Sequence, residues 1–536
     1  MTCEDASTKR RLSRRRFVQA VGASTLMTAG GPLLVRGFSG LAQPAGAMGL
    51  IADPLPPGTP ILLVVDTGGG NDTLNMLCPV DDPWYYDASY GHGSLALSAA
   101  ETLDLPGCPH RMHPSMPWLA SRWQNGDVAF VEGVGETVNS EFSHFEAQDQ
   151  WHTGSFDRDE LRGWLGRYND IAQPGAPLAC ISLGDWHPLL VGDTCSVLAV
   201  SSIDGFEFGV DWRANSDGAF LDSIAAMGTN GEAGVLGEAS AAITQTVTAQ
   251  DRIQDTYDES LLAGVDDWYA EELVNAAMMI RGGVPCQTYV AHQGGFDTHD
   301  NQASTHSERL ARLDTSLQAF FAALAGSPRA ADVTVLVYSE FGRKITQNGS
   351  AGTDHGQACT ATLIGPRVSG GMFGEAPTLD PGGPTRPNRV HDAMVPTVDF
   401  RALLGTCVNF LGADKNAGAE VLDDPKEDLG MLLPIKADAM PPAVPPADLA
   451  PLPRPANPAP EVPIPSEVSG PRPDLPAATH ERVAVAARTV EGTRNVSAVP
   501  PAAPTVPDDL PESGAEQIAK LLRGLRRGRG RPLRHF

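Results

Sequence analysis

Short, mainly apolar runs recur along the chain, and they constrain the fold more than any other feature. Ile61–Val65 is the first of them, with five apolar residues in a row and no polar alternation. This pattern is typical of a strand that is covered on both faces. Similar runs are Val128–Val131, Ala179–Leu183, Thr288–Ala291 and Val333–Tyr338.

Amphipathic helical patterns lie between these runs. One pattern covers about 266–280, and a second one lies near residues 310–324. The second places on one face Leu310, Leu313, Leu317, Phe320, Phe321 and Leu324. Strands that alternate with helices build a mainly parallel sheet with helices on both sides. The sequence therefore predicts an α/β fold, a three-layer α/β/α sandwich.

The two ends of the chain differ from this central part. Residues 1–47 contain Ser13-Arg14-Arg15-Arg16-Phe17, a twin-arginine pattern, followed by a moderately apolar stretch and small residues suited to cleavage. Residues 436–536 hold 20 of the 45 prolines, so residues 436–513 are expected to form a Pro-rich disordered tail. The folded domain is expected at 55–435.

Charge is segregated along the chain. The net charge is −26, but residues 1–47 carry +5 and residues 514–536 carry +6, which leaves −37 for the remainder. Such an acidic body argues against a nucleic-acid partner. Residues 514–536 form a basic amphipathic segment that suits weak contact with a membrane or surface polymer, or alternatively a solvated end.

Localisation follows from the twin-arginine pattern. The protein is expected to be exported by that pathway and to be periplasmic, extracellular or at the cell surface. After the signal, no stretch reaches the roughly 18 uninterrupted apolar residues that a bilayer span needs.

Several cofactors are excluded by their missing motifs. The eight cysteines include no Cys-x-x-Cys pair, so neither an iron–sulfur cluster nor a c-type haem is expected. The body has no Walker loop, and Gly68-Gly69-Gly70-Asn71-Asp72 is not a dinucleotide-binding pattern, so no nucleotide is expected.

Polar, glycine-rich clusters follow four of the predicted strands, and a fifth cluster at 348–356 precedes another apolar run at 361–364. The carboxyl ends of parallel strands share one crevice, so side chains from these clusters are expected to meet there. Carboxylates and imidazoles bind divalent cations such as Zn, Mn, Mg or Ca. The candidate ligands are Asp66, Asp297, His299, Glu340, Asp354 and His355. The alternative is that these are turns, because Asp hydrogen-bonds nearby backbone and Gly permits positive φ.

Two serines precede a predicted helix at 145–151. Ser140 and Ser143 are candidate nucleophiles, and His144 is a candidate to orient or deprotonate a hydroxyl. A serine at this position is also a common helix cap. Asn71 and Arg343 are candidate anion-binding residues, with a structural ion pair as the alternative for Arg343.

Spaced motifs resemble a known family of exported bacterial proteins, domain of unknown function 1501. The resemblance covers about residues 60–410. The motifs are Gly69-Gly70-Asn71-Asp72, Ser143-His144-Phe145-x-Ala147-Gln148-Asp149, Gly163-Trp164-Leu165-Gly166-Arg167, Phe296-Asp297-Thr298-His299 and Ser339-Glu340-Phe341-Gly342-Arg343 with Thr353-Asp354-His355-Gly356.

The resemblance implies an alkaline-phosphatase-like fold, distantly related to sulfatases, and no agreed substrate. By position, Asp66 corresponds to the superfamily's first-strand acid, and Ser140 or Ser143 to its nucleophile. Glu340-Phe341 stands where the superfamily has Asp-His.

Two functions follow as expectations. The first is a metal-dependent hydrolase of phosphate or sulfate esters with a serine nucleophile. The alternative is a catalytically degenerate binding or scaffold protein that acts with an exported partner.

Overall fold

The computed structural model describes residues 53–136, 142–195, 197–204, 248–383, 393–413 and 415–433. These ranges cover most of the predicted domain 55–435. The candidate nucleophile Ser140 lies outside the described residues, as do the predicted signal at 1–47, the Pro-rich tail at 436–513 and the basic segment at 514–536.

The described residues form one large sheet and two small ones. The strands of the large sheet are β1 (Ile61–Asp66), β4 (Val128–Gly135), β5 (Cys180–Leu183), β6 (Val197–Val200), β7 (Thr288–His292), β8 (Val333–Tyr338), β11 (Cys359–Ile364), β12 (Gly371–Gly374) and β13 (Val398–Asp399). The small sheets pair β2 (Leu77–Cys78) with β3 (Arg111–Met112), and β9 (Arg343–Gln347) with β10 (Thr353–His355).

Helices connect most of these strands. The α-helices are α2 (Thr73–Met76), α3 (Pro117–Gln124), α4 (His144–Thr153), α5 (Trp164–Ala172), α8 (Trp268–Arg281), α9 (Gln302–Leu324), α10 (Phe400–Phe410) and α11 (Lys415–Val421). The short 3₁₀ helices are η1 (Pro83–Tyr86), η2 (Gly93–Leu95), η3 (Pro188–Leu190), η4 (Glu259–Leu262) and η5 (Ala330–Asp332).

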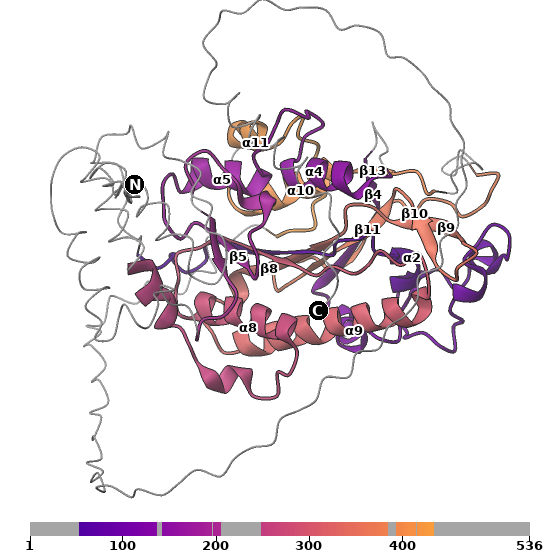
Figure 1. Cartoon of the computed structure of the whole chain (residues 1–536), viewed down its shortest axis with the longest axis horizontal. Helices are drawn as coiled ribbons and strands as arrows, with labels where there is room; N and C mark the ends of the chain where they lie inside the picture. Colours follow the sequence, from indigo (N-terminus) through magenta and orange to yellow (C-terminus); the bar gives the residue numbers. More distant parts are fainter. Residues whose placement is uncertain are drawn as a thin grey trace, which may run out of the picture. The chain divides into compact units, whose positions relative to one another are not determined.

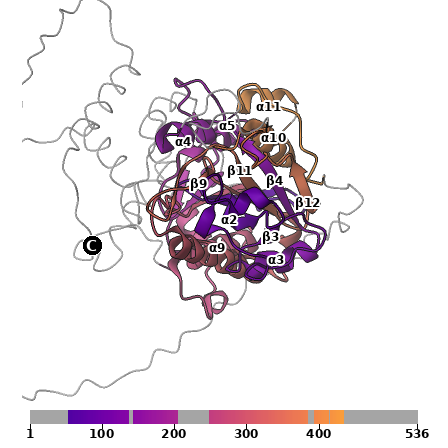
Figure 2. The ribbon, with the colours of Figure 1, turned by 90° about the vertical axis from the view of Figure 1, so that its right-hand side faces the viewer.

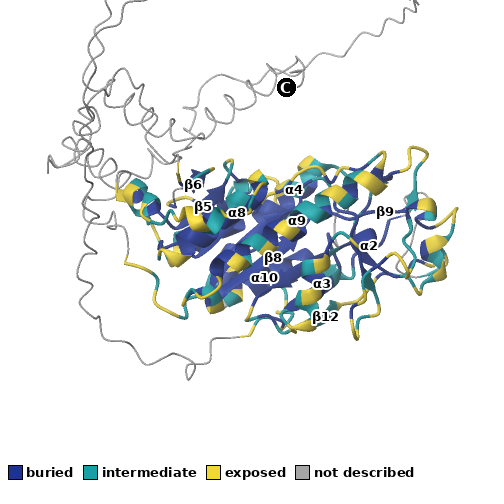
Figure 3. Ribbon diagram, turned by 90° about the horizontal axis from the view of Figure 1, so that it is seen from below, coloured by how far each residue is buried: buried dark blue, intermediate teal, exposed yellow. Residues whose placement is uncertain are grey.

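The sheet lies between two layers of helices, as predicted. Figure 1 shows α4, α5, α10 and α11 on one side of the strands and α8 and α9 on the other, and Figure 2 shows α9 and α10 on opposite sides from a second direction. Residues of β1 alternate between the two resulting cores. Ile61, Leu63 and Val65 pack with α8 and α9, whereas Leu62 and Val64 pack with α5 and α10. Burial on both faces explains the continuous apolar run. Figure 3 shows the neighbouring strand β8 in the colour of buried residues as well.

The five predicted strands and the two amphipathic helices are all present. The strand order is β12-β4-β11-β8-β1-β7-β5-β6, with β13 paired to β4, and β1 lies parallel to both β7 and β8. The exception is β11, which is antiparallel to β4 and β8. Because an antiparallel strand begins where its parallel neighbours end, the segment before Cys359 reaches the same edge as the loops after β1, β7 and β8.

In the described part of the chain, none of the helices combines the length and the apolar character that a membrane span requires.

Candidate metal centre

Several segments meet at the carboxyl edge of β1, β7 and β8. Glu340, which follows β8, accepts hydrogen bonds from the backbone N–H groups of Gly69 and Gly70 in the loop after β1. Arg343 at the start of β9 donates to the carbonyl of Phe296 in the loop after β7. His355 in β10 contacts the carbonyl of Phe142, just before α4, at 2.6 Å. These contacts hold segments that are far apart in the sequence around one point.

One carboxylate oxygen at this edge is surrounded by three imidazoles. Asp297 Oδ1 lies 3.3 Å from His144 Nε2. The Nε2 atoms of His299 and His355 lie 3.1 and 3.2 Å from the same oxygen. The ligand atoms of His144, Asp297 and His355 all lie within 4.8 Å of one another. We call His144, Asp297, His299 and His355 the Asp297 cluster.

The second nitrogen of each imidazole in the cluster faces an acceptor. His144 Nδ1 lies 2.7 Å from Glu340 Oε1, and His299 Nδ1 lies 3.2 Å from Asp354 Oδ1. His355 Nδ1 faces a backbone carbonyl, as described above. A carboxylate or a carbonyl has no proton to donate, so each of these acceptors suits the ring tautomer that carries its proton on Nδ1.

That tautomer would leave three Nε2 lone pairs facing Asp297 Oδ1, an arrangement that becomes favourable when a cation lies between them. Imidazoles that are held from behind by carboxylates or carbonyls are the usual arrangement around a protein-bound metal ion. Three imidazole nitrogens and one carboxylate oxygen suit zinc or manganese better than an all-oxygen site for magnesium or calcium. The donor set therefore fits a transition-metal ion.

Electrostatics keep the carboxylate of this cluster ionised. Burial acts to raise the pKa of Asp297, but the hydrogen bond and charge of Arg343, with His144 and His299 nearby, lower that pKa to about 2. Asp297 is thus anionic at neutral pH.

Glu340 and Asp354 stand behind the imidazoles rather than among the inner donors. Glu340 is buried, and its carboxylate also accepts from the Ser339 hydroxyl and from Gln148 Nε2. Asp354 accepts from Asn348 Nδ2 and lies 3.6 Å from Lys344 Nζ. Each of the two residues holds one imidazole of the cluster in its orientation.

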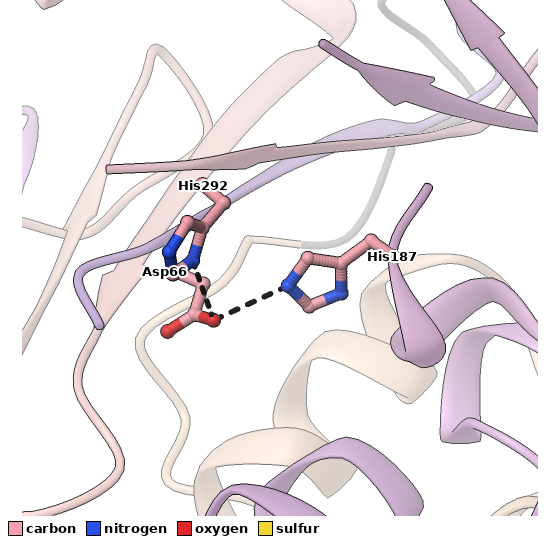
Figure 4. A group of neighbouring side chains, drawn as sticks. All are labelled: Asp66, His187 and His292. Carbon is pink, nitrogen blue, oxygen red and sulfur yellow. Dashed lines mark hydrogen bonds and ion pairs between the residues drawn. The ribbon is translucent and has the colours of Figure 1, made fainter. Parts of the chain in front are cut away.

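A second histidine cluster surrounds Asp66 at the end of β1. His187 Nε2 and His292 Nδ1 each lie 3.2 Å from Asp66 Oδ2, and Figure 4 shows both rings directed at that carboxylate. His152 Nε2, from α4, lies 3.5 Å from the same oxygen. We call Asp66, His152, His187 and His292 the Asp66 cluster.

The Asp66 cluster has a different proton arrangement. His187 Nδ1 accepts the backbone N–H of Leu189, which places the ring proton on Nε2, facing Asp66. Burial acts to raise the pKa of Asp66, but hydrogen bonds from the three imidazoles hold that pKa well below its ordinary value. In this cluster the Asp66 carboxylate accepts hydrogen bonds from imidazoles. His187 suits a metal ion less well, because its Nε2 proton and not a lone pair faces Asp66.

The structure thus divides the predicted ligands. Asp297, His299 and His355 come together, whereas Asp66 lies in the other cluster. His144, predicted as a catalytic residue, joins the Asp297 cluster. Its neighbour Ser143 precedes the first residue of α4, and the Ser143 side chain makes no hydrogen bond that caps the helix.

The two predicted anion-binding residues are both buried. Asn71 Oδ1 accepts from His306 Nε2 at 2.8 Å, and the backbone N–H of Asn71 donates to the Ser339 hydroxyl. Each guanidinium nitrogen of Arg343 donates within the protein, to acceptors on Gly69, Gly70, Thr353, Phe296 and Asp297. Arg343 therefore joins the loops of the site.

Three residues of the Asp66 cluster are not among those predicted from the sequence, namely His152, His187 and His292. His292 directly follows a predicted strand, and His187 follows another one by four residues, so their positions after strands were usable signals. His152 lies eight residues after His144 in the same helix, and no local pattern distinguishes it.

Comparisons with solved structures return fold-level similarities of low identity. A protein in the alkaline phosphatase superfamily from Vibrio parahaemolyticus is 10% identical, with 70% of this chain and 74% of that chain covered and a TM-score of 0.27. The PsFucS1 sulfatase from Pseudoalteromonas sp. is 11% identical, with 69% and 73% covered and a TM-score of 0.31. The lipoteichoic acid synthase LtaP from Listeria monocytogenes is 10% identical, with 70% and 79% covered and a TM-score of 0.26.

Among curated proteins, no relative matches the chain. The family model described as "Protein of unknown function (DUF1501)" matches residues 214–407. This range includes Asp297, His299, Glu340 and His355, which carried the resemblance in the sequence. The match confirms, over residues 214–407, the family that the motifs resemble.

Proposed function

We propose that this protein is an exported, metal-dependent hydrolase of phosphate or sulfate esters, with its metal ion held by the Asp297 cluster. The convergence of three Nε2 atoms on Asp297 Oδ1 carries the proposal. A divalent cation bound there would stabilise the negative charge that develops on the non-bridging oxygens of the ester during substitution.

Ser143 is the proposed nucleophile among the described residues. It lies directly before His144, and its hydroxyl is not used to cap α4. Attack of Ser143 Oγ on phosphorus or sulfur would break the bond to the alcohol oxygen, and the hydroxyl proton of Ser143 would leave with the released alcohol. Water would then hydrolyse the seryl ester and return a proton to Ser143 Oγ. His144 is assigned to metal binding and not to proton transfer, because its Nδ1 contacts Glu340 and its Nε2 faces Asp297.

Metal content and turnover test the proposal together. The full chain is purified without chelator, its bound metals are measured, and aryl phosphates and aryl sulfates are offered as substrates. We expect His355→Ala to lose both metal and turnover, and Ser143→Ala to lose turnover while it keeps the metal. His110→Gln, outside both clusters, is the matched control and should keep both.

The outcomes separate the two expected functions. Metal without turnover of either ester class would favour the binding or scaffold alternative. A protein with neither stoichiometric metal nor turnover would contradict the hydrolase proposal. Turnover that survives Ser143→Ala would move the nucleophile to another group.

Export by the twin-arginine pathway is part of the proposal. The Asp297 cluster draws on residues from His144 to His355, so its geometry exists only in the folded chain. A pathway that transports folded proteins would allow the metal to be bound before export. We expect Arg14→Lys combined with Arg15→Lys to retain the protein in the cytoplasm, as measured by cell fractionation. Unchanged export would contradict the route.

A further inference from the structure

A cavity of about 550 Å³ lies apart from both histidine clusters. Its wall includes Leu74 and Leu77 from the segment after β1, Trp84 from η1, and Glu132 from β4. None of the residues that line it belongs to the Asp297 cluster or the Asp66 cluster. The volume is in the range of small-molecule binding sites.

The charged groups of this cavity have one sign. Asp81, Asp82 and Glu132 line it, and no lysine or arginine is among the described residues of its wall. Such a wall repels anions, so the cavity does not suit the phosphate or sulfate esters proposed for the metal centre. A cation gains from the same field.

One pair inside the wall is poorly satisfied. His110 Nε2 lies 2.8 Å from Glu132 Oε1, and both side chains are about 85% buried. Neither nitrogen of His110 makes a hydrogen bond of suitable geometry within the described residues. The Glu132 carboxylate is therefore buried beside the cavity with an imidazole as its described partner, and a donor from a ligand would complete its hydrogen bonding.

The remaining wall suits the uncharged part of such a ligand. Leu74, Leu77, Leu379 and Met394 provide apolar surface for an aliphatic body. Trp84 adds an aromatic side chain to the same wall, and aromatic faces attract cations. An anionic carboxylate, an aromatic ring and apolar side chains together are the features that bind an alkylammonium group.

We propose that this cavity binds an organic cation, a primary amine on a short aliphatic chain, through Glu132. The site is separate from the proposed ester hydrolysis and does not depend on it. The ammonium group would contact Glu132, and the alkyl chain would pack against Leu74 and Leu77.

Three probes of equal length test the charge preference. Isothermal titration of the full, metal-loaded chain is carried out with n-hexylamine, 1-hexanol and hexanoate. We expect saturable one-to-one binding of hexylamine, at least about tenfold weaker binding of hexanol, and no binding of hexanoate. Equal binding of hexanol and hexylamine would show an apolar cavity without charge recognition and would overturn the proposal.

Two variants locate the binding. Glu132→Gln should weaken hexylamine binding at least about tenfold, because it removes the charge and keeps the shape. Ala376→Trp should abolish binding by filling the cavity from an exposed wall position, where the risk to folding is small. Glu146→Gln, at an exposed ion pair with Arg158, is the control and should bind like the parent chain. Unchanged affinity in both cavity variants, or no hexylamine binding by the parent chain, would overturn the proposal.

Discussion

The Nε2 atoms of His299 and His355 lie 2.9 Å apart, while the Nδ1 atom of each ring faces an acceptor. Two neutral imidazoles in this tautomer would bring their lone pairs together, which is unfavourable without a cation between or beside them. The proposed metal ion would supply that cation, and its binding energy would then contribute to folding stability. The first prediction follows from this relationship.

Addition of zinc or manganese should stabilise the folded chain. At a free metal concentration of about 100 times Kd, the gain in unfolding free energy is about 2.7 kcal/mol, measured by thermal or urea unfolding with and without metal. The double variant His299→Ala, His355→Ala should lose this gain, and His110→Gln should retain it. Equal stabilisation of the double variant would exclude the Asp297 cluster as the metal site.

Removal of the Glu340 charge should weaken metal binding without removing a ligand. Glu340 holds His144 Nδ1 at 2.7 Å, and second-layer partners of this kind typically change metal affinity 10- to 100-fold. Glu340→Gln keeps the size of the side chain, so we expect a decrease of about 10- to 100-fold in affinity in a chelator competition titration. A decrease too large to measure would indicate that Glu340 is itself a ligand, and no decrease would show that it does not orient His144.

A methyl group at Gly69 should disturb the metal centre through the backbone. Gly69 has φ +119°, and a Cβ there would lie 2.5 Å from the backbone nitrogen of Asp297. Gly107 has φ +79° and open space around it, which makes it the matched control. Gly107→Ala should cost about 1–2 kcal/mol in unfolding free energy for its φ alone.

Gly69→Ala should cost about 1–3 kcal/mol more than Gly107→Ala, because of its added steric overlap. It should also lower metal affinity, because relief of the overlap displaces Asp297. Equal unfolding free energies for the two variants would show that the loop relaxes freely, and the link between Gly69 and Asp297 would fail.

Loss of the Asp314 carboxylate should destabilise the packing of α3 on α9. Asp314 is buried in α9 and accepts the backbone N–H groups of Trp118 and Leu119 at 2.9 and 2.8 Å, which are otherwise unpaired in the first turn of α3. Asp314→Ala should lower the unfolding free energy by about 1–3 kcal/mol in urea. Thr315→Ala, at the next and exposed position, should stay within about 0.5 kcal/mol, and similar losses for both would remove the capping role.

Stability should depend on pH through the same side chain. Burial raises the pKa of Asp314 to about 6, although two backbone N–H groups act in the opposite direction. A raised pKa means that the folded chain holds a proton that the unfolded chain has released, so stability falls as pH rises from about 4, the unfolded value, to about 6.

The comparison variant is Asp314→Asn, which does not titrate. The unfolding free energy of the parent chain minus that of the variant should fall by roughly 3 kcal/mol between pH 4 and pH 7. A difference that is flat or rises across this window would contradict the raised pKa.

The strands and main helices could be predicted from the sequence because burial leaves a local record. Ile61–Val65 is apolar throughout since both of its faces are covered, and α9 shows its buried face as a helical repeat. A second local pattern identified Asp297, His299 and His355 as candidates, because each lies in a polar cluster close to a strand. These patterns need only neighbours along the chain.

The partners of those side chains could not be predicted in this way. His299 and His355 converge because β11 runs antiparallel and brings the segment before it to the edge where β7 ends. Asp66 is enclosed by His152, His187 and His292 instead of joining Asp297. Both results depend on strand order and direction, which arise from packing between distant segments and leave no periodic pattern in the sequence.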